Sequence, residues 1–270
     1  MESLSMEATG QVFKMKSLLE NPVKYILPIG DELVEMNSLI GKKLQFQFDG
    51  TILCIRCGRK TKKSFAQGFC FPCMRNAPEA AECIIRPELC LAHEGKGRDP
   101  EWEREHHLKE HFVYLAISSG LKVGVTRSDQ IPTRWIDQGA TRAACIAKTP
   151  NRYLAGVIEV ALKKHFSDKT DWRKMLKNEI IEADLSKEKA RLKGLLPDHL
   201  NQYLIEGPAT IQELNFPVST FPSKVTSIGF DKFPDISGEV IGIKGQYLIF
   251  NDERVLNIRK HTGYVLKMNY

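Results

Sequence analysis

Two Cys-x-x-Cys pairs constrain the fold of this 270-residue chain more than any other feature. Cys54 and Cys57 precede Cys70 and Cys73, with twelve residues between the two pairs. A Cys-x-x-Cys turn presents two thiolates to one ion because its backbone amides point at the sulfurs, and two such turns close a tetrahedral Zn(Cys)4 site. We therefore expect a structural zinc ion, since four thiolates leave no position open for a catalytic water. A redox-active dithiol is the alternative.

A second zinc site is predicted further along the chain. It combines two cysteines from a proline-containing loop with two histidines that are four residues apart: Cys83, Cys90, His107 and His111. Four-residue spacing places two side chains on the same face of a helix, which suits a shared ligand. His93 and His106 compete for the same role. Buried cysteines beside surface histidines would explain the pattern without a metal.

Basic residues gather around the first cysteine pairs, and the net charge of +6 reflects 39 basic and 33 acidic residues. Residues 54–75 contain six basic residues and no acidic one, whereas residues 79–110 contain nine acidic and five basic residues. This polarity predicts a local surface for a polyanion, and the phenylalanines of the loop would either stack on bases or form its small core. The predicted nucleic-acid contacts are Arg59, Lys60, Lys62 and Lys63. Alternatively, these residues keep a zinc loop soluble.

The remaining patterns predict an α+β chain in four parts. These are an N-terminal β unit over 1–53, Cys/His-rich zinc modules over 54–110, a core with a β-hairpin and helices over 111–206, and a C-terminal β domain over 207–270. Segments near the two ends share an Ile-Gly start, a turn and an Ile-Arg end. The two ends could therefore pair in one barrel, although any two hairpins look alike.

Residues 111–127, HFVYLAISSGLKVGVTR, are typical of two strands around a Ser-Ser-Gly turn. A short helix ending at Gly139 and a buried helix, RYLAGVIEVALKKHF, follow. Four polar residues stand out in these segments: Tyr114, Lys122, Arg134 and Glu159. An arginine offers a fixed fork for phosphate oxygens, and a buried carboxylate needs a cation or a metal as partner. A tyrosine acts as a general base only if a neighbouring cation lowers its pKa. Lys122 is the candidate for that cation, and alternatively it positions the attacking water.

The order of these residues resembles the GIY-YIG nuclease superfamily, in which a hairpin carries two motifs, an arginine follows on the first helix and a later glutamate binds a divalent metal. VYL and KVG stand at the two motif positions, and the likeness covers about residues 111 to 180. The first motif lacks its glycine, and Lys122 replaces the second tyrosine. With CIRCGRKTKKSFAQGFCFPC and RWIDQGA, most of the chain is similar to an uncharacterised bacterial family that joins cysteine-rich modules to a GIY-YIG-like core. The resemblance implies the catalytic residues Tyr114, Lys122, Arg134 and Glu159, with Mg²⁺ or Mn²⁺.

These patterns predict a zinc-containing endonuclease that acts on DNA or RNA with a divalent metal. The alternative is a non-catalytic zinc protein that binds nucleic acid or a ribonucleoprotein through its basic loop, and a third is a protein adaptor that uses the acidic segment 79–110. No apolar run approaches the roughly 20 residues of a membrane helix, and the first ten residues lack a signal-peptide pattern. We therefore expect a cytoplasmic protein with no membrane partner.

Overall fold

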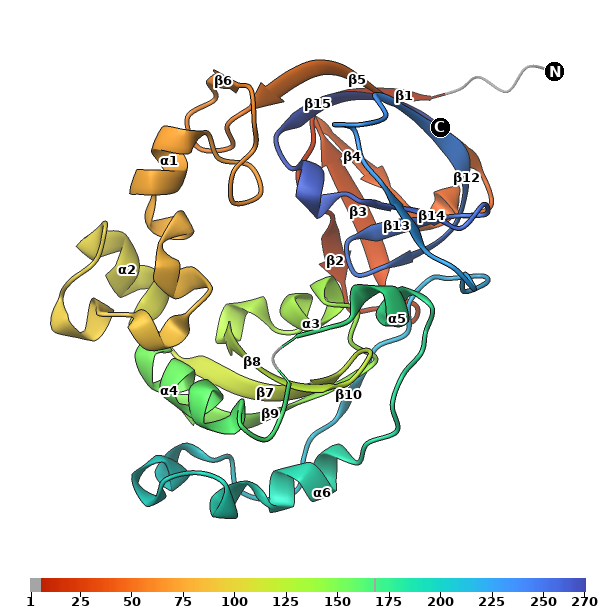
Figure 1. Cartoon of the computed structure of the whole chain (residues 1–270). Helices are drawn as coiled ribbons and strands as arrows, with labels where there is room; N and C mark the ends of the chain where they lie inside the picture. Colours follow the sequence, from red (N-terminus) through yellow and green to blue (C-terminus); the bar gives the residue numbers. More distant parts are fainter. Residues whose placement is uncertain (1–5, 168) are drawn as a thin grey trace. The chain divides into compact units, whose positions relative to one another are not determined.

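The chain folds into two compact units, shown in Figure 1. The computed structural model describes residues 6–167 and 169–270. Unit 1 combines the chain up to Arg75 with Asn215–Tyr270, and unit 2 is Asn76–Leu214. Several sheets and short helices make up these units, which confirms the predicted α+β class.

A large sheet in unit 1 pairs the two ends of the chain. Strand β5 (Lys43–Leu53) lies between β15 (Tyr264–Asn269) and β12 (Asp235–Lys244), and is antiparallel to both. Phe46 of β5 pairs with Ile236 on one side and Met268 on the other, and all three are buried. The remaining strands of this sheet are β1 (Glu7–Gln11), β6 (Lys60–Thr61), β11 (Thr226–Ile228), β13 (Tyr247–Phe250) and β14 (Arg254–Asn257).

A smaller sheet of unit 1 has the order β2 (Lys16–Leu18), β3 (Lys24–Ile29), β4 (Glu32–Glu35). Every second residue of β3, namely Tyr25, Leu27 and Ile29, is fully buried. This alternation places one face of the strand in the core of the unit.

The sheet of unit 2 is built on the predicted hairpin. Strands β7 (His111–Ile117) and β8 (Leu121–Arg127) pair in register from His111↔Arg127 to Ile117↔Leu121. Strand β9 (Arg142–Thr149) pairs with the other side of β7, and β10 (Gln212–Glu213) completes the order β10-β9-β7-β8.

Helices pack on opposite faces of this sheet (Figure 1). Helix α4 (Arg152–Leu162) buries Ala155, Ile158 and Leu162 against the odd-numbered residues of β7. Helix α3 (Thr133–Asp137) covers the even-numbered face, where the Trp135 ring lies 6.0 Å from that of Tyr114. The other helices are α1 (Phe71–Asn76), α2 (Pro100–His107), α5 (Trp172–Leu176) and α6 (Leu185–Ala190).

Side-chain caps explain where two of these helices begin. Asp99 accepts a hydrogen bond from the Trp102 backbone N–H at the start of α2, and Asn151 does the same for Leu154 at the start of α4. Helices α3 and α4 form in the two segments where the sequence predicted a short helix and a buried helix. None of the helices in the described ranges is long and apolar enough to cross a bilayer.

Candidate functional site

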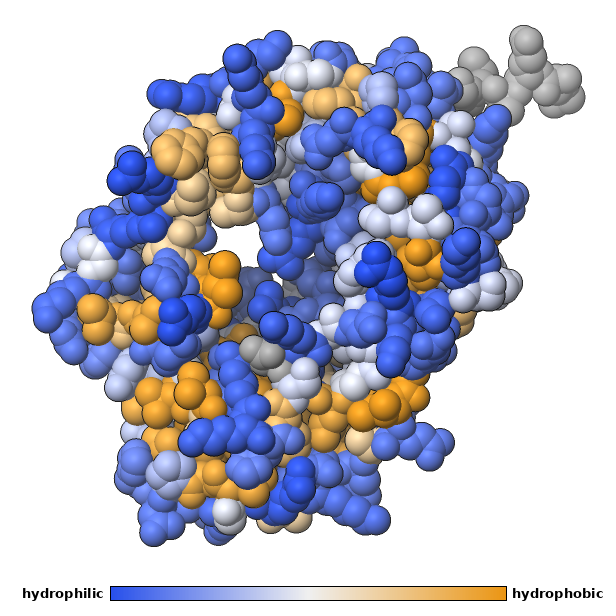
Figure 2. All heavy atoms as spheres, viewed as in Figure 1, coloured by the Kyte–Doolittle hydropathy of each residue, from blue (hydrophilic) through white to orange (hydrophobic). Residues whose placement is uncertain are grey.

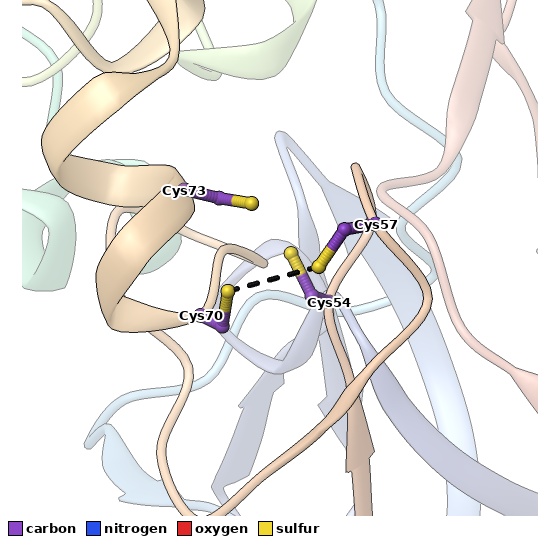
Figure 3. A group of neighbouring side chains, drawn as sticks. All are labelled: Cys54, Cys57, Cys70 and Cys73. Carbon is purple, nitrogen blue, oxygen red and sulfur yellow. Dashed lines mark hydrogen bonds between the residues drawn. The ribbon is translucent and has the colours of Figure 1, made fainter.

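The thiols of the two Cys-x-x-Cys pairs point toward one another (Figure 3). Cys54 and Cys57 come from the turn after β5, Cys70 directly precedes α1 and Cys73 lies in its first turn. The sulfurs of Cys57 and Cys70 are 3.8 Å apart, and all four sulfurs lie within 4.8 Å of one another. A tetrahedron with Zn–S bonds of about 2.3 Å has edges of about 3.8 Å. The cluster therefore has the dimensions of the predicted Zn(Cys)4 site.

Local turns bring the two pairs together. The Gly58 N–H donates to the Cys54 carbonyl at 2.9 Å, which closes the first turn, and the Ile55 N–H donates to the Gly68 carbonyl at 2.9 Å. Gly68 has a φ of +130°, and a Cβ there would lie 2.8 Å from Cγ2 of Ile55. Glycine is therefore required at this position for the loop to fold back onto the first pair.

The environment of the cluster makes its thiols unequal. Burial opposes ionisation of Cys54, but backbone N–H groups, that of Cys70 foremost, lower its pKa to about 6. Burial and the neighbouring thiols raise the pKa of Cys73 to about 12. One thiolate thus forms at the expense of its neighbours, and a divalent cation would allow all four to ionise.

Basic side chains surround this cluster on the outside. The "basic face" is defined here as the six exposed cations Arg56, Arg59, Lys60, Lys62, Lys63 and Arg75. Lys63 lies over the ring of Phe65, Arg75 over the ring of Phe71, and these two rings meet edge to face at 5.5 Å. Phe69 is buried, whereas Phe71 is 50% exposed. Figure 2 shows apolar spheres bordered by hydrophilic ones in this part of unit 1.

Tyr114 lies in the middle of the hairpin and is buried. It pairs with Gly124 of β8, where a Cβ would lie 2.5 Å from the tyrosine hydroxyl. The glycine therefore leaves room for the ring to lie across the neighbouring strand. The Gln138 side-chain amide, directly after α3, donates a hydrogen bond to the hydroxyl at 3.0 Å.

The other three predicted catalytic residues come from different elements of unit 2. Arg134 of α3 lowers the pKa of the Tyr114 phenol through its charge and a hydrogen bond, and Glu159 of α4 raises it through its charge. Lys122 pairs with Ala116 across the hairpin, so it lies on the sheet face that carries Tyr114. The Glu159 carboxylate lies 3.4 Å from Nζ of Lys163, one helical turn away.

The surroundings of Tyr114 set the ionisation of its phenol. Burial raises the pKa of Tyr114, whereas Arg134 and Gln138 lower it. The role of Lys122 in lowering this pKa stays a prediction. The surroundings hold Tyr114 in its protonated form at neutral pH, which suits a hydrogen-bond donor better than a general base.

The second predicted zinc cluster differs from the sequence prediction by one residue. Cys83, Cys90 and His107 come together with Glu103, and their ligand atoms lie within 4.8 Å of one another. His111 is outside this group, because α2 ends at His107 and His111 is the first residue of β7. The residue that shares a helix face with His107 is therefore Glu103, four residues before it on α2, and not His111. Burial lowers the pKa of His111 to about 4.

The two competing histidines also lie outside the cluster. His93 stacks on Tyr153 with ring centroids 4.5 Å apart, and His106 stacks on Trp102 at 4.0 Å. Sequence reasoning missed Glu103 and Gln138. Both lie four residues from a residue already singled out, Glu103 from His107 and Gln138 from Arg134, so helical spacing was the available signal.

Comparison with known proteins assigns the chain to a family. Residues 41–266 match the family model described as "Protein of unknown function (DUF2797)". The chain belongs to the DUF2797 family. The match includes both cysteine clusters and the hairpin, and it confirms the predicted membership of an uncharacterised family. No curated protein and no solved structure matches this DUF2797 chain.

Proposed function

We propose that this DUF2797 protein binds single-stranded nucleic acid through the basic face of its four-cysteine module. The proposal rests on one observation: residues 54–75 carry six exposed cations and a half-exposed Phe71, with Arg75 over its ring, and no acidic residue. Lysine and arginine contact phosphates, and an exposed ring stacks on a base. Stacking on one ring requires an unpaired base, which favours single strands over duplexes.

A zinc ion would stabilise the loop that carries this basic face. The loop between the two Cys-x-x-Cys pairs contains little regular structure beyond β6, and the four thiols meet where its ends come together. Residues Cys54, Cys57, Cys70 and Cys73 would hold the ion, which fixes the loop and leaves the basic side chains directed to solvent.

The first test measures salt dependence. Binding of labelled single-stranded and duplex DNA and RNA is followed by fluorescence anisotropy as salt is raised. The variant R59Q/K60Q/K62Q/K63Q should bind more weakly, with a log–log salt slope smaller by about 3, because each single-strand phosphate contact contributes about 0.7. The control R173Q/K174Q/K187Q/K193Q removes the same charge from the helical segments of unit 2 and should bind like the parent. Equal weakening in both variants, or binding that ignores salt, would contradict the proposal.

A second test isolates the aromatic contribution. F71A should lose about 1–3 kcal/mol of single-strand binding, and F71L, which keeps the apolar volume without a π face, should lose nearly as much. Wild-type affinity in F71A would exclude stacking. A ribonucleoprotein offers the same phosphates and unpaired bases, so tight binding to structured RNA and none to free single strands would redirect the proposal to that partner.

Phosphodiester cleavage at the hairpin is a second candidate function. The observation that favours it is that Arg134 and Glu159, from different helices, both lie close enough to the Tyr114 phenol to shift its pKa, Arg134 downward and Glu159 upward. Arg134 would contact a phosphate oxygen, and Glu159 would hold Mg²⁺ or Mn²⁺, which lowers the pKa of a bound water. The burial of Tyr114, 1% exposed, favours the binding function over cleavage.

Cleavage is tested with single-stranded, duplex and branched DNA and structured RNA in Mg²⁺ or Mn²⁺. R134A and E159Q should abolish the products and retain zinc, whereas K164A, which changes an exposed residue just after α4, should cleave normally. Equal cleavage by all variants would identify a contaminating nuclease. Binding without cleavage under every condition would leave nucleic-acid binding as the function.

A further inference from the structure

Four metal-ligating side chains cluster in unit 2, apart from the residues used above. Cys83 belongs to a 3-10 turn (Glu82–Ile84), Cys90 follows the next one (Pro87–Leu89), and Glu103 and His107 lie in α2. All four are buried, with exposed fractions of 8%, 1%, 2% and 2%. Their ligand atoms lie within 4.8 Å of one another, so they surround a common point.

The distances match a shared ion. Nδ1 of His107 lies 3.5 Å from the Cys90 sulfur and 3.5 Å from Oε2 of Glu103. The four-residue spacing of Glu103 and His107 places both on one face of α2. The Asp99 cap fixes the start of α2, four residues before Glu103.

The Glu103 carboxylate is oriented from outside the cluster. Its Oε1 accepts a hydrogen bond from the Arg98 backbone N–H at 2.9 Å, while Oε2 is the atom near His107. Gly97 packs against the carboxylate so closely that any Cβ at this position would overlap it. Metal-binding carboxylates are commonly held by such outer hydrogen bonds.

Burial of these donors calls for a cation. Two thiols, a carboxylate and an imidazole share a site that is closed to water, where an ionised group is costly unless it is neutralised. Thiolate and imidazole ligands together favour Zn²⁺, and four protein donors complete its tetrahedral coordination. A zinc ion bound here is structural, because no ligand position remains for water.

The segment that carries the two cysteines has little core of its own. Its buried cluster consists of the small residues Ala81, Cys83, Cys90 and Ala92. Ile84 packs against this cluster only partly buried, and Ile85, Leu89 and Leu91 are exposed, so the segment gains stability from a metal more than from its own packing.

This segment docks on α4. The Arg152 guanidinium donates to the backbone carbonyls of Cys83 at 2.9 Å and Ile84 at 2.7 Å. One turn along α4, Gly156 lies directly against the backbone of Pro87 and Glu88. A metal that fixes the two cysteines thereby fixes the surface on which the first half of α4 rests.

We propose that Cys83, Cys90, Glu103 and His107 bind a second, structural zinc ion that holds the 3-10 segment against α4. This site does not depend on nucleic-acid binding or cleavage.

Zinc content of the full-length protein tests the proposal. The parent should contain two zinc ions per chain. C57S/C70S should lose one ion, C90S/H107N should lose the other, and E103Q should also fall to one. H106N is the matched control, because His106 neighbours His107 in sequence but stacks on Trp102, and it should retain both ions. H111N should likewise retain both zinc ions. Loss of an ion in E103Q but not in H111N would show that Glu103, and not His111, is the fourth ligand.

A single zinc ion in the parent that C57S/C70S loses, two ions in C90S/H107N, or a Cys83–Cys90 disulfide in the isolated protein would overturn the proposal. If C90S/H107N does not fold, X-ray absorption of zinc in C57S/C70S decides. The expected shell has two sulfurs at about 2.3 Å and two nitrogen or oxygen atoms at about 2.0–2.1 Å. A shell of four sulfurs, or no zinc at all, would also overturn the proposal.

Discussion

Lys244, at the end of β12, illustrates how burial sets the chemistry of a single residue. Its side chain is fully buried, and its ammonium lies 5.1 Å and 5.5 Å from the rings of Phe221 and Phe216. Burial lowers its pKa to about 8 from the usual 10.5. The rings attract the cation, but they do not replace the water that burial removes.

Replacing Lys244 with methionine should stabilise the protein at pH 7 by up to about 3 kcal/mol, because about 2.5 pKa units correspond to that free energy. Between pH 8 and 10.5 the unfolded state binds more protons than the folded state, so the stability of the parent rises with pH across this window. The gain in K244M should therefore shrink as pH approaches 10.5. Urea denaturation of parent and variant at about pH 7 and about pH 10 measures both effects. K42M, at an exposed lysine, should show neither, and a destabilised K244M would contradict the assignment.

Among the secondary-structure elements, helix α4 contacts both the hairpin and the segment that carries the second cysteine cluster. One face buries Ala155, Ile158 and Leu162 against the hairpin, and Gly156 meets the 3-10 segment of the second cysteine cluster. The same helix carries Glu159. Its close approach to a backbone explains a glycine in the middle of a helix, where glycine is otherwise unfavourable.

Gly156→Ala should destabilise unit 2 by about 1–3 kcal/mol, since a methyl group there would overlap the backbone of Pro87 and Glu88. At an exposed helical position, by contrast, replacing glycine with alanine would raise the free energy of unfolding by up to about 1 kcal/mol. Chemical denaturation gives the difference in the free energy of unfolding. Gly194→Ala is the control, because a Cβ there meets no atom within 4 Å. A more stable G156A protein would show that α4 does not rest on this segment.

At the scale of the whole molecule, unit 1 is assembled from both ends of the chain. β5 receives β12 on one edge and β15 on the other, and the Leu53 N–H donates to the Gly263 carbonyl at 2.8 Å just before the first cysteine pair. The four-cysteine cluster therefore follows a strand that pairs with two strands of the C-terminal segment and, at Ile52 and Leu53, with β6. The second cluster, of two cysteines, a glutamate and a histidine, belongs to unit 2.

Deleting residues 215–270 should remove the protection, in hydrogen–deuterium exchange, of the β5 amides that precede its pairing with β6 at Ile52 and Leu53, because β12 and β15 are removed. The amides of β7 and β9 in unit 2 should stay protected, since their partners lie within Asn76–Leu214. Loss of protection in both units would show that they unfold as one. Retained protection of β5 would mean that its neighbours are not β12 and β15.

Local patterns determined much of this protein. The Cys-x-x-Cys spacing, the hairpin at 111–127 and helices α3 and α4 each depend on neighbouring residues, so sequence was sufficient to predict them. The boundaries of the four predicted parts stay a prediction. The faint likeness between the two ends did not specify that β5 pairs with β12 and β15, because pairing between distant strands depends on which apolar faces meet in the fold.

Tertiary structure alone decided which residues complete each site. The i, i+4 rule applies only while the helix continues, and the end of α2 at His107 replaces His111 with Glu103 in the second cluster. Burial likewise cannot be read from a single strand: the pKa of Tyr114 is raised because α3 and Gly124 close around the phenol and bury it. The sequence was sufficient to identify the chemical groups, and the packing of distant elements determined which residues they contact and how burial shifts their pKa.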